Sequence, residues 1–319
     1  MNKFTKFIVI IAIVFIITGC SLFMITLVSN NLDLSKINNH KYRLETYEIN
    51  DSFENIYIDT LDIDIKFIFS EEEKVVINEQ ERLDHFVYVE ENALKIEVND
   101  QRKFYDFINI FSPNREILVY LNKTNFQNLN IKDSTGDIII SKDFSFKDVN
   151  IYSSTGDVSF FGKTSENLKI RLSTGDITVE NVNANTIDLT VSTGDIHLNE
   201  INSNANVLIN SSTGDIFLKN IKCNNIESYA STGDLLLINV IANNKFNFQL
   251  STGTISFDSC DASEIYMSTS TGDIIGTLLS EKIFDVDVDT GDFDVPKTYN
   301  GGICKIVTNT GDVKISYVK

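Results

Sequence analysis

The sequence predicts an all-β protein: a single-stranded parallel β-solenoid (β-helix) of about ten coils of 19 or 20 residues, preceded by a β-rich N-terminal region and one transmembrane helix. Three observations predict this fold. A turn motif recurs at a nearly constant interval, apolar and polar residues alternate on both sides of it, and 22 uncharged residues stand near the N-terminus. A constant period is typical of repeat proteins, in which each unit buries its apolar face against its neighbours.

Residues 7–28 are apolar and long enough to cross about 30 Å of hydrocarbon as a helix. Lys3 and Lys6 precede them, and positively charged flanks stay in the cytoplasm. We therefore interpret residues 1–28 as a membrane anchor or signal segment, and we expect the rest of the chain outside the cell membrane.

Residues 17–20 read "ITGC", which resembles the lipobox of bacterial lipoproteins, where the cysteine is acylated after signal cleavage. Cys20 is therefore a candidate lipidation site. The apolar run continues for eight residues beyond Cys20, which a lipoprotein does not require, so an uncleaved single-span anchor is favoured and a lipid anchor is the alternative.

Residues 29–40 are polar and are expected to form a tether. Residues 41–125 contain several alternating or apolar runs, such as "NIYIDTLDIDIKFIF", and no glycine. We expect either irregular first coils or a β-rich cap that covers the end of the solenoid, since an exposed strand edge invites pairing with another chain.

Residues 126–319 contain ten copies of a motif close to "STGD". Its threonine is present in all ten copies, and its glycines are separated by 19 or 20 residues. The glycines are Gly136, Gly156, Gly175, Gly194, Gly214, Gly233, Gly253, Gly272, Gly291 and Gly311.

Apolar residues stand six positions before the motif threonine in every copy, and directly after the aspartate position in every copy. Polar residues mostly separate the apolar ones, and alternation with period two indicates strands with one buried face. Each repeat is thus expected to be strand, tight turn and strand. Successive coils are expected to stack in register, which pairs the backbone groups of each coil with those of the next. The last strand, residues 313–319, is then expected at the end of the stack, where Lys314 and Lys319 would discourage pairing with another chain.

Glycine suits a corner that needs positive φ, and serine, threonine and aspartate side chains bond to the backbone groups of turns. We interpret the motif as a structural corner. The alternative is calcium bound along the stacked carboxylates, which would repel one another at about 4.8 Å if they were left bare. These carboxylates are Asp137, Asp157, Asp176, Asp195, Asp215, Asp234, Asp273, Asp292 and Asp312.

A denser acidic segment occurs at residues 284–295, "FDVDVDTGDFDV". Its aspartates alternate with apolar residues, so three of them share the solvent face of one strand, and two more follow the corner. If a divalent ion binds this protein, we expect it at these residues, although a solvated acidic face is the simpler explanation. They are Asp285, Asp287, Asp289, Asp292 and Asp294.

Composition excludes several functions. The net charge is −18, and leaving out Lys3 and Lys6 makes the remainder −20, so no basic surface for nucleic acid is expected. No His, Cys and carboxylate spacing resembles a zinc site, and no cofactor is expected. A polysaccharide-active enzyme would need two carboxylates at a break in the repeat, with Arg, His or Lys side chains nearby that adjust their pKa. The repeat departs from its consensus only mildly, as at Thr254 and Gly276, and no such side chains gather there. We therefore predict that the protein is not an enzyme.

The repeated "STGDI", the strands around it, the segment "REILVYLNKTNFQNLNIKDSTGDI" and the apolar start together resemble the bacterial DUF4097 family, whose members are also called putative adhesins. The resemblance covers roughly residues 42–319. It implies a membrane-tethered β-solenoid of the cell envelope, sometimes encoded beside envelope-stress regulators, and no established catalytic residue.

We therefore expect a non-enzymatic, membrane-anchored surface protein that binds an envelope or host polymer or a protein. An alternative is a sensory or scaffolding component of an envelope-stress system. A calcium-binding β-roll or a polysaccharide-active enzyme are minor alternatives.

Overall fold

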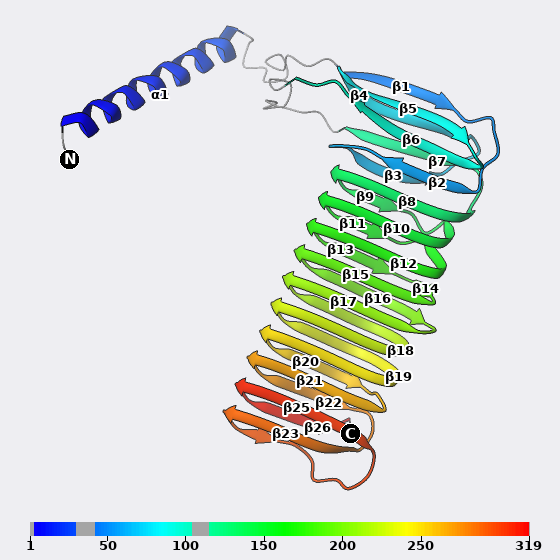
Figure 1. Ribbon diagram of the computed structural model, residues 1–319, viewed down its shortest axis with the longest axis vertical. Coiled ribbons are helices and arrows are strands. Elements are labelled where there is room, and N and C mark those ends of the chain that lie inside the picture. Colours follow the sequence, from blue (N-terminus) through cyan, green and yellow to red (C-terminus); the bar gives the residue numbers. More distant parts are fainter. Residues whose placement is uncertain (1–2, 30–41, 104–114, 319) are drawn as a thin grey trace.

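The computed structural model describes residues 3–29, 42–103 and 115–318, and its strands stack into one long rod (Figure 1). Of the tether expected at residues 29–40, only Ser29 is described, as the last residue of the N-terminal helix. The all-β solenoid of about ten turns, preceded by one apolar helix, is confirmed.

Helix α1 (Lys3–Ser29) is long and apolar enough to cross a membrane over Thr5–Ser29, where its mean hydropathy is 3.0. None of its most apolar stretch is buried against the rest of the chain. Two of its threonine hydroxyls bond to carbonyl oxygens four residues back, from Thr18 Oγ1 to Val14 at 2.7 Å and from Thr26 Oγ1 to Leu22 at 2.9 Å. These two hydroxyls are therefore satisfied without water, as hydrocarbon surroundings require.

Each repeat folds as a strand, the glycine corner and a second strand, as in β15 (Thr186–Thr193) and β16 (Ile196–Ser203). In the middle coils the chain continues into a third side, where apolar residues such as Val182 and Ile201 are also buried. The other strands of the repeat region are β8 (Asn125–Thr135), β9 (Ile138–Ile140), β10 (Ser145–Thr155), β11 (Val158–Phe160), β12 (Lys163–Thr174), β13 (Ile177–Glu180), β14 (Asn183–Ala184), β17 (Asn206–Thr213), β18 (Ile216–Thr232), β19 (Leu235–Thr252), β20 (Ile255–Cys260), β21 (Glu264–Thr271), β22 (Ile274–Leu278), β23 (Lys282–Thr290), β24 (Phe293–Asp294), β25 (Gly302–Thr310) and β26 (Val313–Tyr317).

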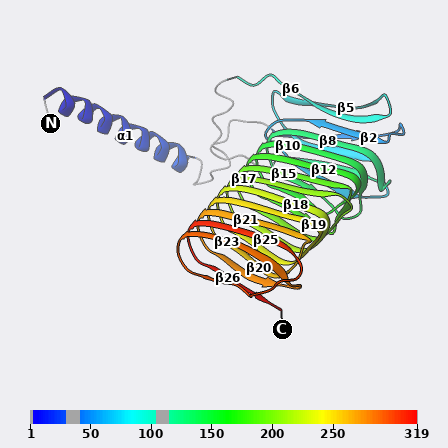
Figure 2. The same ribbon diagram turned by 60° about the horizontal axis from the view of Figure 1, so that its bottom comes forward.

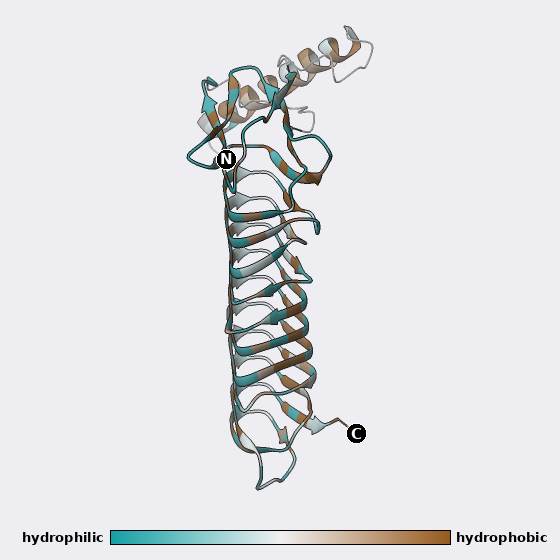
Figure 3. Ribbon diagram, turned by 90° about the vertical axis from the view of Figure 1, so that its right-hand side faces the viewer, coloured by the Kyte–Doolittle hydropathy of each residue, from teal (hydrophilic) through white to brown (hydrophobic). Residues whose placement is uncertain are grey.

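Strands of neighbouring coils pair in parallel and in register, so that equivalent residues stack in columns. The apolar positions of the alternation point inward and form one continuous core from Phe53 to Ile315. Figure 2 looks toward the C-terminal end of the rod and shows the two sides of each coil enclosing this core. Figure 3 shows the alternation along the strands as bands of opposite hydropathy.

Two kinds of strand precede the repeats. β2 (Asn55–Asp59) pairs in parallel with β6 (Ala93–Asp100), and β3 (Asp64–Phe69) pairs in parallel with β7 (Glu116–Leu121), so these four strands extend the stack. β1 (Tyr42–Glu48), β4 (Lys74–Gln80) and β5 (Leu83–Glu90) pair antiparallel, β4 with β7 and with β1, and β5 with β6. The antiparallel strands cover the N-terminal end of the rod.

The expectation that coils stack in chain order is wrong at both ends of the rod. At the N-terminal end, β2 lies between β6 and β8. At the C-terminal end, β25 lies between β21 and β23, so the last coil of the chain is the second-last layer of the rod (Figure 1). The strand with Lys314 is therefore internal, and β23 is at the end instead.

The return of the chain at the C-terminal end depends on two adjacent glycines. A Cβ atom on Gly301 would lie 1.8 Å from the Glu281 carbonyl oxygen, and one on Gly302 would lie 1.7 Å from that of Ser263. Because these two carbonyls belong to the chain segments on either side, only glycine lets the backbone re-enter between them.

Candidate functional site

The ten motif glycines form a single column along the rod. Their φ angles lie between 120° and 157°, and a Cβ atom at any of them would come within 1.9 to 2.2 Å of a carbonyl oxygen in the adjacent layer. Any side chain would push the layers apart, so each corner requires glycine for both its conformation and its space.

The aspartates after these glycines form a ladder of hydrogen bonds. Where an aspartate stands at this position, from Asp64 to Asp312, its carboxylate Oδ1 accepts a hydrogen bond from the backbone N–H at the same position of the adjacent layer, at 2.7 to 3.0 Å. Thr254 interrupts the ladder, because it has no carboxylate for the layer of Asp273. The ladder begins at Asp64, which the sequence analysis missed because Ile63 replaces the glycine there, and it ends at Asp292. These backbone donors stabilise the stacked charges that would otherwise repel one another.

The acidic segment of residues 284–295 forms the last layer of the rod. Asp285, Asp287 and Asp289 are exposed on β23, and among the described strands β23 pairs only with β25. Charged side chains on an edge strand hinder pairing with another chain, so this segment protects the open end of the rod. Lys305 Nζ lies 3.9 Å from Asp285.

In the described part of the chain, no three His, Cys, Asp or Glu side chains are arranged to hold a metal ion. Binding of a divalent ion at the acidic segment stays a prediction. A calcium titration followed by thermal unfolding would check it, with Asp287→Asn as the variant that should respond.

The four cysteines are unpaired. Cys20 lies on the exposed surface of α1, and the helix continues past it without a break to Ser29. The other three are buried in the core, where burial raises the thiol pKa to about 12, 11 and 12 for Cys223, Cys260 and Cys304 respectively. They are therefore unsuited to metal or redox chemistry in the folded protein.

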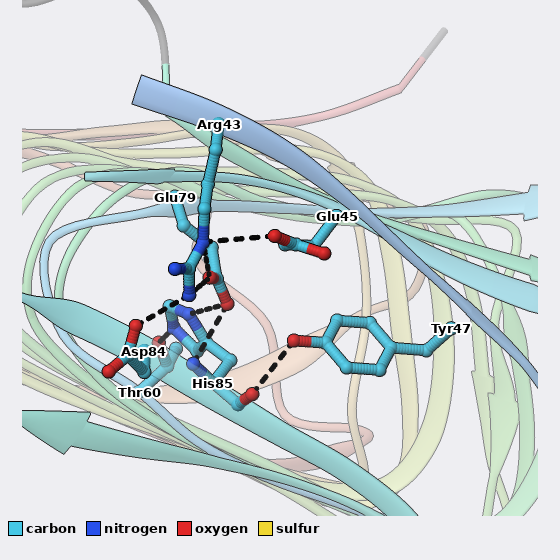
Figure 4. A network of polar contacts seen from close by, with 7 residues as sticks. All are labelled: Arg43, Glu45, Tyr47, Thr60, Glu79, Asp84 and His85. Carbon is cyan, nitrogen blue, oxygen red and sulfur yellow. Dashed lines mark hydrogen bonds and ion pairs between the residues drawn. The ribbon is translucent and has the colours of Figure 1, made fainter. Parts of the chain in front are cut away.

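A buried polar network joins the antiparallel strands to the first coil (Figure 4). The Glu79 carboxylate accepts hydrogen bonds from the Arg43 guanidinium at 2.8 Å and from the His85 backbone N–H at 2.8 Å, and its Oε1 lies 3.2 Å from His85 Nδ1. His85 Nε2 is 2.9 Å from Thr60 Oγ1, and the Tyr47 hydroxyl donates to the His85 carbonyl at 3.0 Å. Burial opposes the charge of Glu79, but the bonds from His85 and Arg43 outweigh it and lower the pKa of this carboxyl.

The His85–Glu79 pair resembles the acid–base pairs of enzymes, but its position prevents that chemistry. Both side chains have no exposed surface, so no substrate can reach them. The network instead holds the cap on the rod, since it links β1, β4 and β5 to the residue after β2.

A groove of about 550 Å³ lies on the outer face of the rod, where the cap meets the first repeats. Its floor is formed by four parallel strands, in the order β6, β2, β8 and β10. Two half-exposed tyrosines, Tyr57 and Tyr152, stand on this floor among amide and charged side chains. The groove could not be predicted from the sequence, because its residues come from segments up to about a hundred positions apart.

A family model described as Toastrack DUF4097 matches residues 53–211 and 202–319. No curated protein matches the sequence.

Solved structures with a similar arrangement include three bacterial proteins. A putative adhesin from Parabacteroides distasonis has 13% identity and a TM-score of 0.46, over 88% of this chain and 98% of that one. A putative adhesin from Bacteroides fragilis has 12% identity and a TM-score of 0.37, over 86% and 97%. A putative lipid-binding protein, also from Parabacteroides distasonis, has 13% identity and a TM-score of 0.25, over 88% and 98%. Similarity at this level carries no information on a ligand.

Proposed function

This chain belongs to the Toastrack DUF4097 family, and on that premise we propose that it is a non-enzymatic protein of the bacterial cell surface. Helix α1 holds it in the membrane, and the β-solenoid outside binds an envelope or host polymer or a protein, as in adhesion.

The observation that carries this proposal is the separation of the apolar helix from the core. None of the most apolar stretch of α1 is buried, whereas the solenoid core is built only from residues between Phe53 and Ile315. A helix with this hydropathy is stable without protein contacts only in hydrocarbon or as a cleaved signal segment. The remaining β-domain has a complete core and so folds without the helix.

The surface chemistry supports binding rather than catalysis. The buried pair of His85 and Glu79 is closed to solvent, and aspartates of the ladder such as Asp176 accept hydrogen bonds from backbone N–H groups. The net charge of −18 disfavours nucleic acid and anionic lipid headgroups as partners. The proposed function needs no cofactor.

Intact-mass measurement of the protein from membranes tests the anchor. A mass that begins at Met1 supports the transmembrane anchor, and an acylated N-terminal Cys20 supports the lipid anchor. Protease added to intact cells should remove the β-domain in both cases. Protection of the domain would contradict a surface location.

Binding is tested with the β-domain, residues 42–319, against cell-wall and host-surface fractions, with and without calcium. The proposed adhesin should bind its target when soluble. A sensory or scaffolding component should instead lose its effect when the anchor is deleted, and failure of the soluble domain to bind any fraction would favour that role.

A further inference from the structure

We infer that the groove at the junction of cap and repeats binds a neutral glycan chain. This inference rests on the proposed surface-binding function and names the class of ligand for one site on the rod.

The floor of the groove is a rigid grid of outward-facing side chains. Two rows of side chains run across three layers, on β2, β8 and β10. The first row contains Tyr57, Asn130 and Asn150. The second row, two residues further along each strand, contains Asp59, Lys132 and Tyr152. Tyr57 and Tyr152 are thus two layers and two residues apart, about 12 Å between Cα atoms at ordinary strand spacings. That separation corresponds to a short run of linked sugar rings.

Both tyrosine rings are accessible for stacking, since their exposed fractions are 41% for Tyr57 and 38% for Tyr152. An aromatic ring held on a sheet offers a flat apolar face and a polar tip at little cost in side-chain entropy. Sugar rings present an apolar face of C–H groups surrounded by hydroxyls, which matches such a surface.

Amide side chains lie beside the tyrosines on the floor of the groove, from Asn130 and Asn150. A side-chain amide both donates and accepts hydrogen bonds. Sugar hydroxyls also donate and accept, so the polar part of the floor matches a glycan.

The charges of the groove favour a neutral ligand. Lys132 Nζ lies 3.4 Å from Asp59 and Lys95 Nζ lies 2.7 Å from Glu90, so each lysine in the groove is already near a carboxylate. With a net charge of −18 on the chain, an anionic polymer would be repelled. The exposed lining has few aliphatic side chains, which also disfavours a protein partner at this site.

The experiment titrates the full-length protein in detergent micelles with soluble neutral glycans: α-glucan, β-glucan, mannan and chitin oligosaccharides. We expect at least one of them to bind. Tyr57→Ala and Tyr152→Ala should each weaken that binding by about tenfold, which is the loss of one aromatic stacking contact. Tyr57→Phe should bind within about threefold of the wild type, because the ring remains.

Tyr299→Ala is the matched control, since Tyr299 is 91% exposed and lies outside the groove. It should bind like the wild type, and thermal unfolding should show all variants folded. Binding to none of the glycans overturns the inference, as does equal binding by the alanine variants in the groove. If the β-domain still captures a protein or an anionic polymer, the proposed surface function stands and only the glycan site is wrong.

Discussion

Replacing Asp133 by asparagine should stabilise the protein more at neutral pH than in mild acid. Asp133 occupies a core-facing position on β8, where Ser153 lies beside it in the next layer and Leu172 follows in the layer after that. It is 5% exposed, and apart from a weak contact with the Ser134 N–H neither carboxylate oxygen has a hydrogen-bond partner among the described residues. Asparagine has nearly the same shape without the charge.

The magnitude follows from the pKa of this carboxyl. Burial raises the pKa of Asp133 from 3.8 to about 7, with a further rise from Asp62 and Asp64 that Arg115 and the Ser134 N–H only partly offset. Between pH 3.8 and about pH 7, Asp133 is therefore protonated in the folded protein and ionised in the unfolded chain. The contribution of Asp133 to stability is greatest in acid and falls as the pH rises toward 7, by roughly 4 kcal/mol in total at about 1.4 kcal/mol per pH unit.

Urea unfolding at about pH 5 and about pH 8 measures the effect. The gain in unfolding free energy of Asp133→Asn over the wild type should be larger at the higher pH by about 2.5 kcal/mol, which is the part of the total that lies in this interval. Asp51→Asn, whose carboxylate faces solvent, is the matched control and should show no such difference. An equal effect of Asp133→Asn at both pH values would refute the argument.

Three further outcomes are expected. Gly194→Ala should lower the unfolding free energy by about 3 kcal/mol or more, since its Cβ atom would lie 2.1 Å from a carbonyl oxygen, whereas the exposed Ser192→Ala should change thermal stability by less than about 0.5 kcal/mol. Glu79→Gln should lower the unfolding free energy by about 3 kcal/mol in urea near neutral pH, because His85 loses a buried charged partner. Folding lowers the pKa of Glu79, so this loss should shrink as the pH falls below the ordinary glutamate pKa. A loss that grows in acid would contradict this role of Glu79. Alkylation of the β-domain by iodoacetamide should require unfolding, and rapid modification of the native domain would disprove burial of Cys223, Cys260 and Cys304.

The coil itself could be predicted from the sequence because its causes are local. A glycine is needed wherever a carbonyl oxygen of the adjacent layer lies beneath the Cβ position, and the apolar alternation follows from the two faces of each strand. The same logic explains why the corner of the first coil, within the expected region of irregular coils or cap, was not recognised. The corner of β2 and β3 carries Ile63 in place of glycine, yet it keeps Asp64 as the first rung of the ladder.

The order of the layers could not be predicted from the period. The spacings between Gly272, Gly291 and Gly311 remain 19 and 20 residues because the length of a coil depends on the cross-section of the rod and not on which coil lies next to it. The adjacent glycines at 301 and 302 were the one local signal of the return.

The groove was equally hidden from sequence reasoning. Tyr57 and Asn150 face the same surface only because β2 pairs with β8 and β8 with β10, and nothing in the local pattern of either residue indicates that pairing. Buried Asp133 was missed for a related reason, since its position in the alternation is apolar or small in other repeats.

The displaced layers at the two ends have a consequence for how such proteins change length. At each end of the rod the layers do not follow the order of the chain. The segments that form the end layers are therefore separate from the repeats between them. Duplication or deletion of a central repeat would therefore lengthen or shorten the rod by about 4.8 Å at a time without disturbing either end.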